Sequence, residues 1–309
     1  MTAMTEPPQS SLDLGLPEEP LSAGHKDPAA AHIRARLDEQ ARELLAHTEG
    51  ARVGTDPEHV HALRVAVRRA RAALKADHGT VPDSDTLQDE LKWLGGSLGA
   101  VRDFDVQLDH LRSQAAGFDS DEQAAVESLL AGLVKDRAAA RKRMLATLRS
   151  KRFQSALQAL ATAAMSAPLP GAEVEKETAL IEVIRKPHRK LMKAAGSIGV
   201  DPVDDDLHSL RIQGKRLRYA AEMAAVTEKK RVRSLVAATK EFQDLLGDHQ
   251  DAVIAEETIR RLVGEHTDPR VIFVAGRLVE RERTRKADRR SRWREALDKV
   301  DEMAKAALG

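Results

Sequence analysis

Cysteine is absent from the 309 residues of this chain. The chain therefore has no disulfide framework, no thiolate metal site and no cysteine nucleophile, and a reducing compartment is its simplest location. Aromatic residues reach only 3% of the sequence, whereas charged residues make up 32%. This composition, with abundant Ala, Leu, Arg, Glu and Lys, is typical of helical bundles and excludes an all-β fold.

Long apolar runs are also lacking. No stretch approaches the roughly 20 apolar residues that a membrane-spanning helix needs. The first 25 residues contain no Lys or Arg and no apolar run, so both parts of a secretory signal are missing. We therefore expect a cytoplasmic protein that does not enter a membrane.

Residues 1–26 differ in composition from the rest of the chain. They hold four prolines among Ser, Gly and acidic residues and have little apolar content, which predicts a disordered tail. All four charged residues before His25 are acidic, so residues 26–309 carry 50 basic and 45 acidic side chains. A chain of nearly neutral net charge binds polyanions when its cations gather on one surface, so the pattern of charges matters more than their total.

Helical periodicity continues from residue 28 almost to the C-terminus. Apolar residues recur at three- and four-residue spacing through 57–76, 84–116, 120–149, 173–196, 204–226, 229–262 and 268–301. Asp56-Pro57 is typical of a helix start, whereas Gly99 and Gly247 predict helix breaks. The sequence Pro-Leu-Pro-Gly at 168–171, near the midpoint, predicts a boundary between one half at 27–167 and another at 168–309.

The two halves share two motifs in the same order. Segment 61–71 reads HALRVAVRRAR and segment 208–218 reads HSLRIQGKRLR, with the His and all four shared cations in register at an offset of 147 residues. At an offset of 148 residues, a second set matches: Lys92, Leu98, Gly99 and Asp103 with Lys240, Leu246, Gly247 and Asp251. Chance likeness between Arg-rich helices explains scattered cations but not this register. We interpret the pattern as duplication of a helical unit of roughly 140 residues.

The repeated motif forms a basic stripe on a helix. His61, Arg64, Arg68, Arg71 and Lys75 fall within an arc of about 80° along about 21 Å of helix axis, and apolar residues occupy the opposite side. His208, Arg211, Lys215 and Arg218 line up in the same way in the second copy. Neither 61–75 nor 208–218 contains an acidic residue, although like charges at this spacing are mildly destabilising. We therefore expect a neutralising partner outside each helix.

Three interpretations of these stripes compete. Asp103 and Asp251 are internal candidates, predicted as buried partners that aim the guanidinium groups, but two carboxylates do not balance at least eight cations. A bound polyanion is the external candidate, because Arg offers a fork of donors and Lys a compact charge. The third interpretation is a solvated basic face without a ligand.

Metal binding and catalysis have less support from the sequence. His59 and His61 lie on different faces of a helix, and neither an HExxH motif nor a P-loop, a G-x-S-x-G elbow or a kinase signature occurs. We expect no catalytic residue, no metal and no cofactor. One alternative is a metal-dependent phosphohydrolase that acts on polyphosphate or nucleotides through Asp248, His249 and Asp251.

Another alternative is a scaffold for nucleic acid or granules. Single-strand binders normally stack bases on aromatic side chains, and the one aromatic residue at the stripes is Tyr219, at the edge of the second. Recognition of phosphates alone fits the stripes better.

Four motifs together resemble a known family. HxLRVAxRRxR at 61–71, LGxVRDFDV at 98–106, HxLRIxxKRLRY at 208–219 and KxxQxxLGDxxD at 240–251 are similar to those of the CHAD family, the conserved histidine α-helical domain. The resemblance covers about residues 28–305. It implies two four-helix bundles related by a pseudo-twofold axis, with the basic stripes facing a central groove. It further implies binding of inorganic polyphosphate without catalysis, and association with polyphosphate granules.

The resemblance also implies which side chains hold the polymer. It places these residues at the groove: His61, Arg64, Arg68, Arg69 and Arg71 with His208, Arg211, Lys215, Arg216 and Arg218, and in addition Lys92, Arg102 and Lys240. Lys75 extends the first stripe. Gln250 stands where the first copy has Arg102, so we expect the two halves to be unequal. A further cluster either lines the groove or faces solvent: Lys186, Arg189, Lys190 and Lys193.

Overall fold

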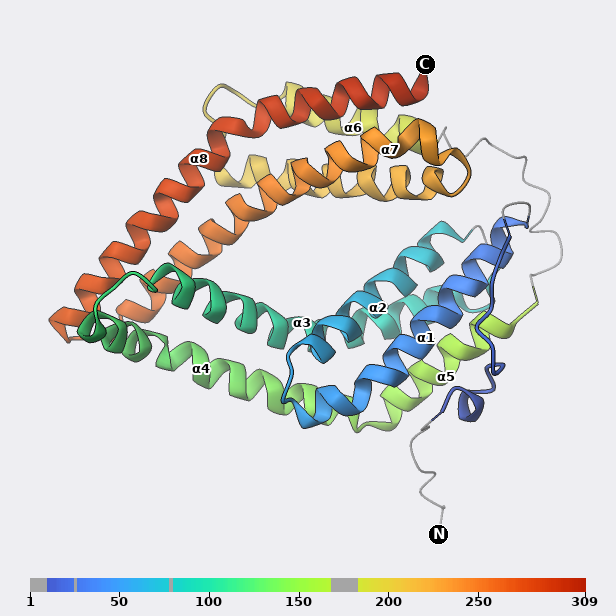
Figure 1. Cartoon of the computed structure of the whole chain (residues 1–309), viewed down its shortest axis with the longest axis horizontal. Helices are drawn as coiled ribbons and strands as arrows, with labels where there is room; N and C mark the ends of the chain where they lie inside the picture. The colour runs from blue at the N-terminus through green and yellow to red at the C-terminus, as the bar shows by residue number, and fades with distance from the viewer. Residues whose placement is uncertain (1–9, 25–26, 78–79, 168–182) are drawn as a thin grey trace, which may run out of the picture. The chain divides into compact units, whose positions relative to one another are not determined.

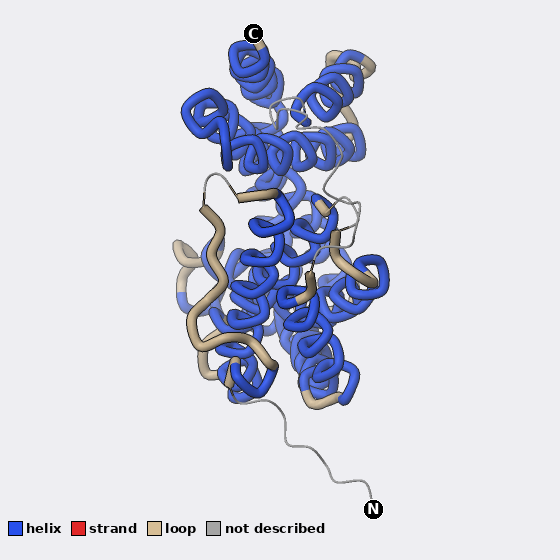
Figure 2. The backbone as a smooth tube through the Cα atoms, turned by 90° about the vertical axis from the view of Figure 1, so that its right-hand side faces the viewer, coloured by secondary structure: helices blue, strands red, loops and turns tan. Residues whose placement is uncertain are grey.

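The computed structural model of the chain describes residues 10–24, 27–77, 80–167 and 183–309. Within these ranges the regular elements are helices and no strand occurs (Figure 2), which confirms the all-α prediction. The elements are the 3₁₀ helix η1 (Leu12–Leu14) and the helices α1 (Ala29–Val53), α2 (Glu58–Ala76), α3 (Ser84–Gln114), α4 (Ser120–Leu148), α5 (Lys151–Met165), α6 (Arg185–Gly196), α7 (Asp204–Val263) and α8 (Pro269–Leu308) (Figure 1). None of these helices is both long and apolar enough to cross a membrane.

The chain forms two compact units. Unit 1 comprises Met1–Asp109 and Gly132–Glu175, and unit 2 comprises His110–Ala131 and Lys176–Gly309. The end of α3 and the start of α4 thus group with unit 2. The sequence motif near the midpoint, 168–171, lies outside the described residues. The duplication of one bundle into two stays a prediction.

The core of unit 1 lies between the four helices α1, α2, α3 and α5, and the C-terminal part of α4 also contributes to it. α1 packs against both α2 and α5. Fully buried leucines from the four helices meet in one cluster, among them Leu37, Leu63, Leu98 and Leu160. Burial of one such side chain stabilises the fold by about 1.5–3 kcal/mol. This packing fixes the apolar face of α2 and leaves its cations on the other side.

The N-terminal segment is a correction to the sequence-based prediction. Residues 1–26 are predicted to be disordered, but residues 10–24 are folded onto unit 1, whereas 1–9 and 25–26 lie outside the described residues. Leu14 and Leu16 are each only 2% exposed and belong to the core of unit 1. Arg42 Nη2 donates to the carbonyl oxygen of Pro17 at 2.7 Å, and the buried Asp38 accepts from the backbone N–H of Leu21 at 3.0 Å. A few apolar side chains therefore suffice because α1 supplies polar partners for the backbone.

α5 is a helix that the periodicity analysis does not include. Ser150 precedes it, and the Ser150 Oγ accepts from the backbone N–H of Phe153 at 3.1 Å. A serine in this position satisfies a donor that the first turn leaves free, which is a recognised helix-start signal. Its buried face is rich in alanine, which weakens the apolar pattern along the sequence.

Unit 2 is built mainly from α6, α7 and α8. α7 is assigned as one helical element, yet His208 Nδ1 lies 2.8 Å from Gln250 Oε1. These residues would be about 63 Å apart in a straight helix, so α7 folds back on itself, as Figure 1 shows. We call residues 204–222 the first arm and residues 230–263 the second arm. Gly214 and Phe242 are in contact where the arms pack together, and α8 covers both α6 and α7.

Candidate functional site

α2 presents a basic surface in unit 1. Asp56 Oδ1 accepts from the backbone N–H of Glu58 at 2.8 Å, so the helix begins where the sequence predicts. Leu63, Val67 and Leu74 are at most 2% exposed and anchor the apolar face. On the other faces, four side chains are exposed and form no ion pair with any described residue: Arg68, Arg69, Lys75 and, on α3, Lys92. The α2 cations are thus held by a helix that the core fixes in place.

Arg64 is the one α2 cation with a carboxylate partner in the described part of unit 1. Its Nη1 donates to Asp103 Oδ1 at 2.5 Å and to the carbonyl oxygen of Gly99 at 3.2 Å. The pairing with Asp103 is the one that the sequence predicts. Asp103 is not buried, however, because its side chain is 60% exposed and that of Arg64 is 37% exposed. The pair therefore orients the guanidinium group at the surface.

The glycines of the second motif do not break helices, and that prediction is wrong. Gly99 lies within α3 and Gly247 lies within α7. A Cβ atom at Gly99 would lie 3.8 Å from Arg64 Nη1, and one at Gly247 would lie 3.8 Å from Arg211 Nε. In each unit the glycine leaves a flat stretch of helix surface against which the arginine lies.

Three more predicted site residues of unit 1 are half-buried: His61, Arg71 and Arg102. Arg71 Nε is buried and meets no hydrogen-bond acceptor among the described residues. A buried N–H group of this kind is costly unless a partner satisfies it.

The first arm of α7 carries the corresponding cations of unit 2. Arg211 faces Asp251 on the second arm. Packed atoms around the Asp251 carboxyl disfavour its charge and raise its pKa, whereas the charges of Arg211 and Arg285 oppose this shift. Lys215 is exposed, and its Nζ lies 5.9 Å from the ring centroid of Tyr219.

The remaining α7 cations differ in their hydrogen-bond and ion-pair partners. Arg216 Nη1 donates to the neutral Gln213, at Oε1, at 3.2 Å. Arg218 donates to Glu222 Oε1 at 2.7 Å and to Gln243 Oε1 at 3.0 Å, so a carboxylate just beyond the motif already balances its charge. Lys240 on the second arm is exposed.

The two units differ at the position next to the histidine. In unit 2, His208 is held by Gln250. Arg102 occupies the matching position of the sequence in unit 1, and its side chain forms no hydrogen bond or ion pair with a described residue. Unit 1 therefore has one more cation at this position, in line with the predicted inequality of the halves.

Asp248 and His249, which the phosphohydrolase alternative requires together with Asp251, contact different neighbours. His249 is 1% exposed, and its Nε2 lies 3.3 Å from Asp204 Oδ1. Burial lowers the pKa of His249. Asp248 instead pairs with Arg285 and Arg289 of α8 at 3.4 and 3.2 Å. Among the described residues, no group of three or more His, Asp or Glu side chains is placed to hold a metal ion.

One cluster next to Asp251 was missed by sequence reasoning. Glu282 on α8 is a fully buried carboxylate, and His110 Nε2 lies 2.6 Å from its Oε1. Arg285 Nη1 approaches both residues, at 3.0 Å from His110 Nε2 and 3.5 Å from Glu282 Oε2. No signal along the chain connects residues that are 172 positions apart. The charge of Arg285 in this cluster also opposes the raised pKa of Asp251.

Comparisons with known proteins identify relatives of this chain. The sequence model of the family described as the CHAD domain matches residues 35–260. The uncharacterized proteins MT2285 and Rv2226 of two Mycobacterium tuberculosis strains, CDC 1551 and H37Rv, are each 29% identical to the chain over 300 residues, covering 91% of this chain and 55% of their own length. The chain thus spans about half the length of these relatives.

Two solved structures are similar to this one. The crystal structure of the CHAD domain from the plant Ricinus communis superposes with a TM-score of 0.67 at 27% identity, covering 91% of this chain and 95% of that one. PptA from Streptomyces chartreusis superposes with a TM-score of 0.66 at 21% identity, covering 88% of this chain and 100% of that one. The likeness to PptA shows a shared fold.

Proposed function

Because this chain belongs to the CHAD-domain family, we propose that it binds inorganic polyphosphate through the basic surfaces of its two units, without a covalent step. The α2 surface comprises His61, Arg64, Arg68, Arg69, Arg71, Lys75, Lys92 and Arg102. The α7 surface comprises His208, Arg211, Lys215, Arg216, Arg218 and Lys240. Retention on polyphosphate granules in the cytoplasm follows from the same binding.

One observation supports the proposal above the others. Arg68, Arg69, Lys75 and Lys92 are exposed in one unit and have no ion pair with a described residue. An ordinary solvated helix face mixes both signs of charge, because i,i+4 pairs of opposite sign are stabilising and like pairs are not. A bound polyanion supplies the negative charge that these four side chains lack.

The chemistry of the side chains favours phosphate over other anions. Arg presents two parallel N–H donors that match two phosphate oxygens, and Lys adds a compact charge. Arg64 is already oriented by Asp103 and by the carbonyl oxygen of Gly99, so less side-chain freedom is lost when a ligand binds.

Nucleic acid is a weaker match to the same surfaces. Tyr219 is the single aromatic residue in the two basic stripes, 61–75 and 208–219, and it is half-buried. Since stacking on aromatic rings supplies about 1–3 kcal/mol per base, a surface without it depends on phosphate contacts alone. Polyphosphate offers those contacts at a higher charge density.

The decisive experiment is a charge reversal in both units. Arg64→Glu together with Arg211→Glu should weaken binding to long-chain polyphosphate at least about tenfold, because each reversal removes one contact and adds a repulsion. Lys142→Glu together with Arg143→Glu, on the exposed face of α4, makes the same change in net charge and should leave binding within about twofold of the parent. Circular dichroism checks that helicity is retained. Equal binding of the Arg64/Arg211 variant and the parent would refute the proposal.

Two further measurements separate the alternatives. In a competition titration at about 0.15 M salt, DNA and RNA should displace polyphosphate only at large excess, and equal competition would favour a nucleic-acid scaffold. Incubation of the pure protein with polyphosphate and a divalent metal should release no phosphate. Release that is lost in Asp248→Asn or Asp251→Asn would favour the phosphohydrolase.

A further inference from the structure

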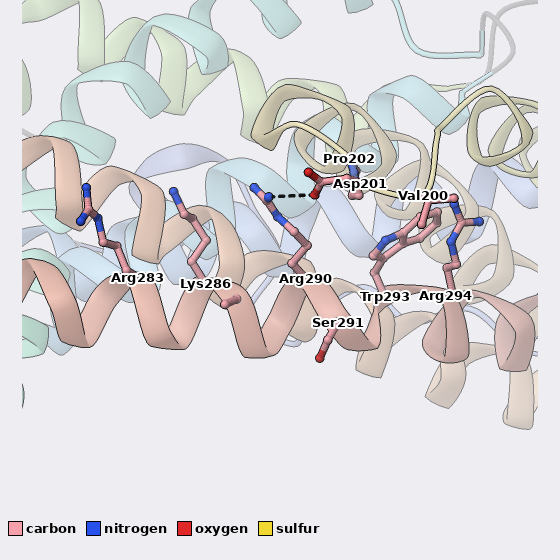
Figure 3. A pocket seen from close by; sticks show the side chains of 10 residues that line it. Val200, Asp201, Pro202, Arg283, Lys286, Arg290, Ser291, Trp293 and Arg294 are labelled. Carbon is pink, nitrogen blue, oxygen red and sulfur yellow. Dashed lines mark hydrogen bonds and ion pairs between the residues drawn. The ribbon is translucent and has the colours of Figure 1, made fainter.

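A second basic site lies in unit 2, apart from the α7 surface. It is a pocket of about 330 Å³ between α8 and the connection from α6 to α7 (Figure 3). Four cations of α8 line it: Arg283, Lys286, Arg290 and Arg294. Its volume lies at the lower end of the range of small-molecule sites, about 300–1,000 Å³. No residue of the α2 or α7 surface takes part in it.

The cations form a row along α8. On a helix, positions 283, 286, 290 and 294 fall within an arc of about 80° over about 16 Å of axis. Figure 3 shows Arg283, Lys286 and Arg290 extending from the same side of α8, whereas Ser291 points away. A row of this length can contact a small molecule at several points along its side.

Two carboxylates behind the row hold it in place. Lys286 Nζ lies 3.1 Å from Asp204 Oδ2 and 3.3 Å from Glu256 Oε2, and Arg290 Nη2 donates to Asp204 Oδ1 at 2.6 Å. Partial burial opposes the charge of Asp204, but the hydrogen bonds from Arg290 and Lys286 outweigh it and lower its pKa. The row is thus pre-ordered before any ligand arrives.

The donors of the row are not saturated. Arg290 Nε is buried and has no acceptor among the described residues. Arg294 uses Nη2 on the carbonyl oxygens of Ile198 and Gly199, at 3.2 and 2.7 Å. Arg283 is 50% exposed and shares Glu256 with other cations.

Asp201 is the one carboxylate among the described residues that line the pocket. Its Oδ1 lies 3.4 Å from Arg290 Nη1, at the long end for such a contact, and its side chain is 90% exposed. An exposed ion pair of this kind contributes little to stability and is readily replaced by a better anion. Asp201 therefore occupies a position that an incoming oxyanion would take.

We propose that this pocket binds the phosphoryl group of a small molecule, which replaces Asp201 at Arg290 and lies along Arg283 and Lys286. Val200, 96% exposed, and Pro202 add an apolar wall beside the row. A molecule with an organic part beside its phosphoryl group therefore fits better than a bare inorganic anion. The pocket is too small, and too well supplied with carboxylates behind the row, for a long polymer.

Tryptophan fluorescence provides a direct test. The chain has only two tryptophans, and one of them, Trp293, lines the pocket with the guanidinium carbon of Arg294 4.3 Å from its ring centroid. In a Trp93→Phe background, Trp293 is the single reporter. Titration with AMP and, separately, with pyrophosphate should give a saturable change, and AMP should bind more tightly. Tighter binding of pyrophosphate than of AMP would favour an inorganic ligand and overturn the proposal that the ligand has an organic part.

The variants separate binding from structural effects. Arg283→Gln should weaken binding about tenfold through loss of a charge-assisted hydrogen bond, and Lys286→Gln provides a second test of the same row. Asp201→Asn should strengthen binding about threefold, because it removes the competing carboxylate. Arg292→Gln removes an exposed α8 cation outside the pocket and serves as the matched control. If the four cations have only a structural role, Asp201→Asn should not increase the affinity for the ligand.

Calorimetry with the same ligands detects binding that leaves the fluorescence of Trp293 unchanged. The Arg64→Glu/Arg211→Glu protein should bind AMP as the parent does, which keeps this site distinguishable from the polyphosphate surfaces. Absence of saturable heat and of fluorescence change with both ligands, in the parent and in Asp201→Asn, would overturn the proposal.

Discussion

Arg64 Nη1 on α2 lies 2.5 Å from Asp103 Oδ1 on α3, in a pair that stays partly open to solvent. A polyphosphate chain at Arg64 must share this guanidinium group with the carboxylate. Asp103→Asn should therefore strengthen polyphosphate binding about threefold, since it removes one negative charge beside the ligand and keeps a hydrogen-bond acceptor. Equilibrium titration at fixed salt measures this.

Asp89→Asn is the matched control for that change. Asp89 is also an exposed aspartate of α3, but it lies about 21 Å along the helix from Asp103. Its loss makes the same change in net charge and should alter binding much less. Weaker binding by Asp103→Asn would mean that the orientation which Asp103 gives to Arg64 matters more for binding than the negative charge of Asp103.

The slope of log Kd against log salt should report how many cations contact the polymer. Polyphosphate, like a nucleic acid backbone, releases condensed counterions when cations bind it, so log Kd rises linearly with log salt. Arg68→Gln and Lys75→Gln should each reduce the slope by about one, whereas Lys142→Gln on α4 should leave it unchanged. An unchanged slope in the first two variants would remove these residues from the binding surface.

The sequence predicts the repeated helices of this protein better than it predicts their surroundings. The stripe on α2 follows from spacing alone, because a helix fixes which residues share a face. Its partner Asp103 is predicted from the second motif that both halves share, but the predicted burial of Asp103 is wrong. The helix break predicted at Gly99 is wrong, because a glycine within a helix marks either a break or a place of close approach, and only the position of Arg64 decides between them. The Glu282–His110 contact has no local signal at all.

The N-terminal segment is also held by contacts that its own composition does not predict. Its composition is that of a disordered tail, but Arg42 and Asp38 of α1 bind its backbone. Leu16→Ala should lower the free energy of unfolding of unit 1 by about 2–5 kcal/mol, as expected for a buried leucine. Leu12→Ala, at a side chain that is 63% exposed, should change it by less than about 0.5 kcal/mol. Urea unfolding compares them, and equal midpoints would mean that the segment does not stay bound in solution.

The carboxyl of Asp251 should make the α7 surface sensitive to pH. Its raised pKa means that the folded state takes up a proton more readily than the unfolded state. Ionised Asp251 therefore destabilises the fold at neutral pH, and this penalty disappears as pH falls through the raised pKa. Asp251→Asn should be at least as stable as the parent at pH 7, and the two should converge in acid.

The same titration affects binding at Arg211. As Asp251 becomes neutral, Arg211 loses its counter-charge, so the affinity of the parent for polyphosphate should approach that of Asp251→Asn as pH decreases. Comparing the two proteins at each pH cancels the effects of pH that both proteins share. A constant ratio of their affinities between pH 4 and pH 7 would contradict the assignment.

Gly214 on the first arm of α7 lies under the ring of Phe242 on the second arm. A Cβ atom at this position would lie 2.8 Å from Phe242 Cε1, closer than packed carbon atoms approach, and Phe242 is completely buried. Gly214→Ala should therefore destabilise unit 2 by about 1–3 kcal/mol, although alanine is the better helix former. Gly96→Ala is the matched control, because no atom lies within 4 Å of the added methyl group, and it should stabilise unit 1 by up to about 1 kcal/mol. Phe242→Leu should recover part of the loss in the Gly214→Ala protein, since it removes the ring atoms that the methyl group meets. Denaturant unfolding of the three variants decides the matter, and a stabilising Gly214→Ala would show that the two arms do not pack as closely as described.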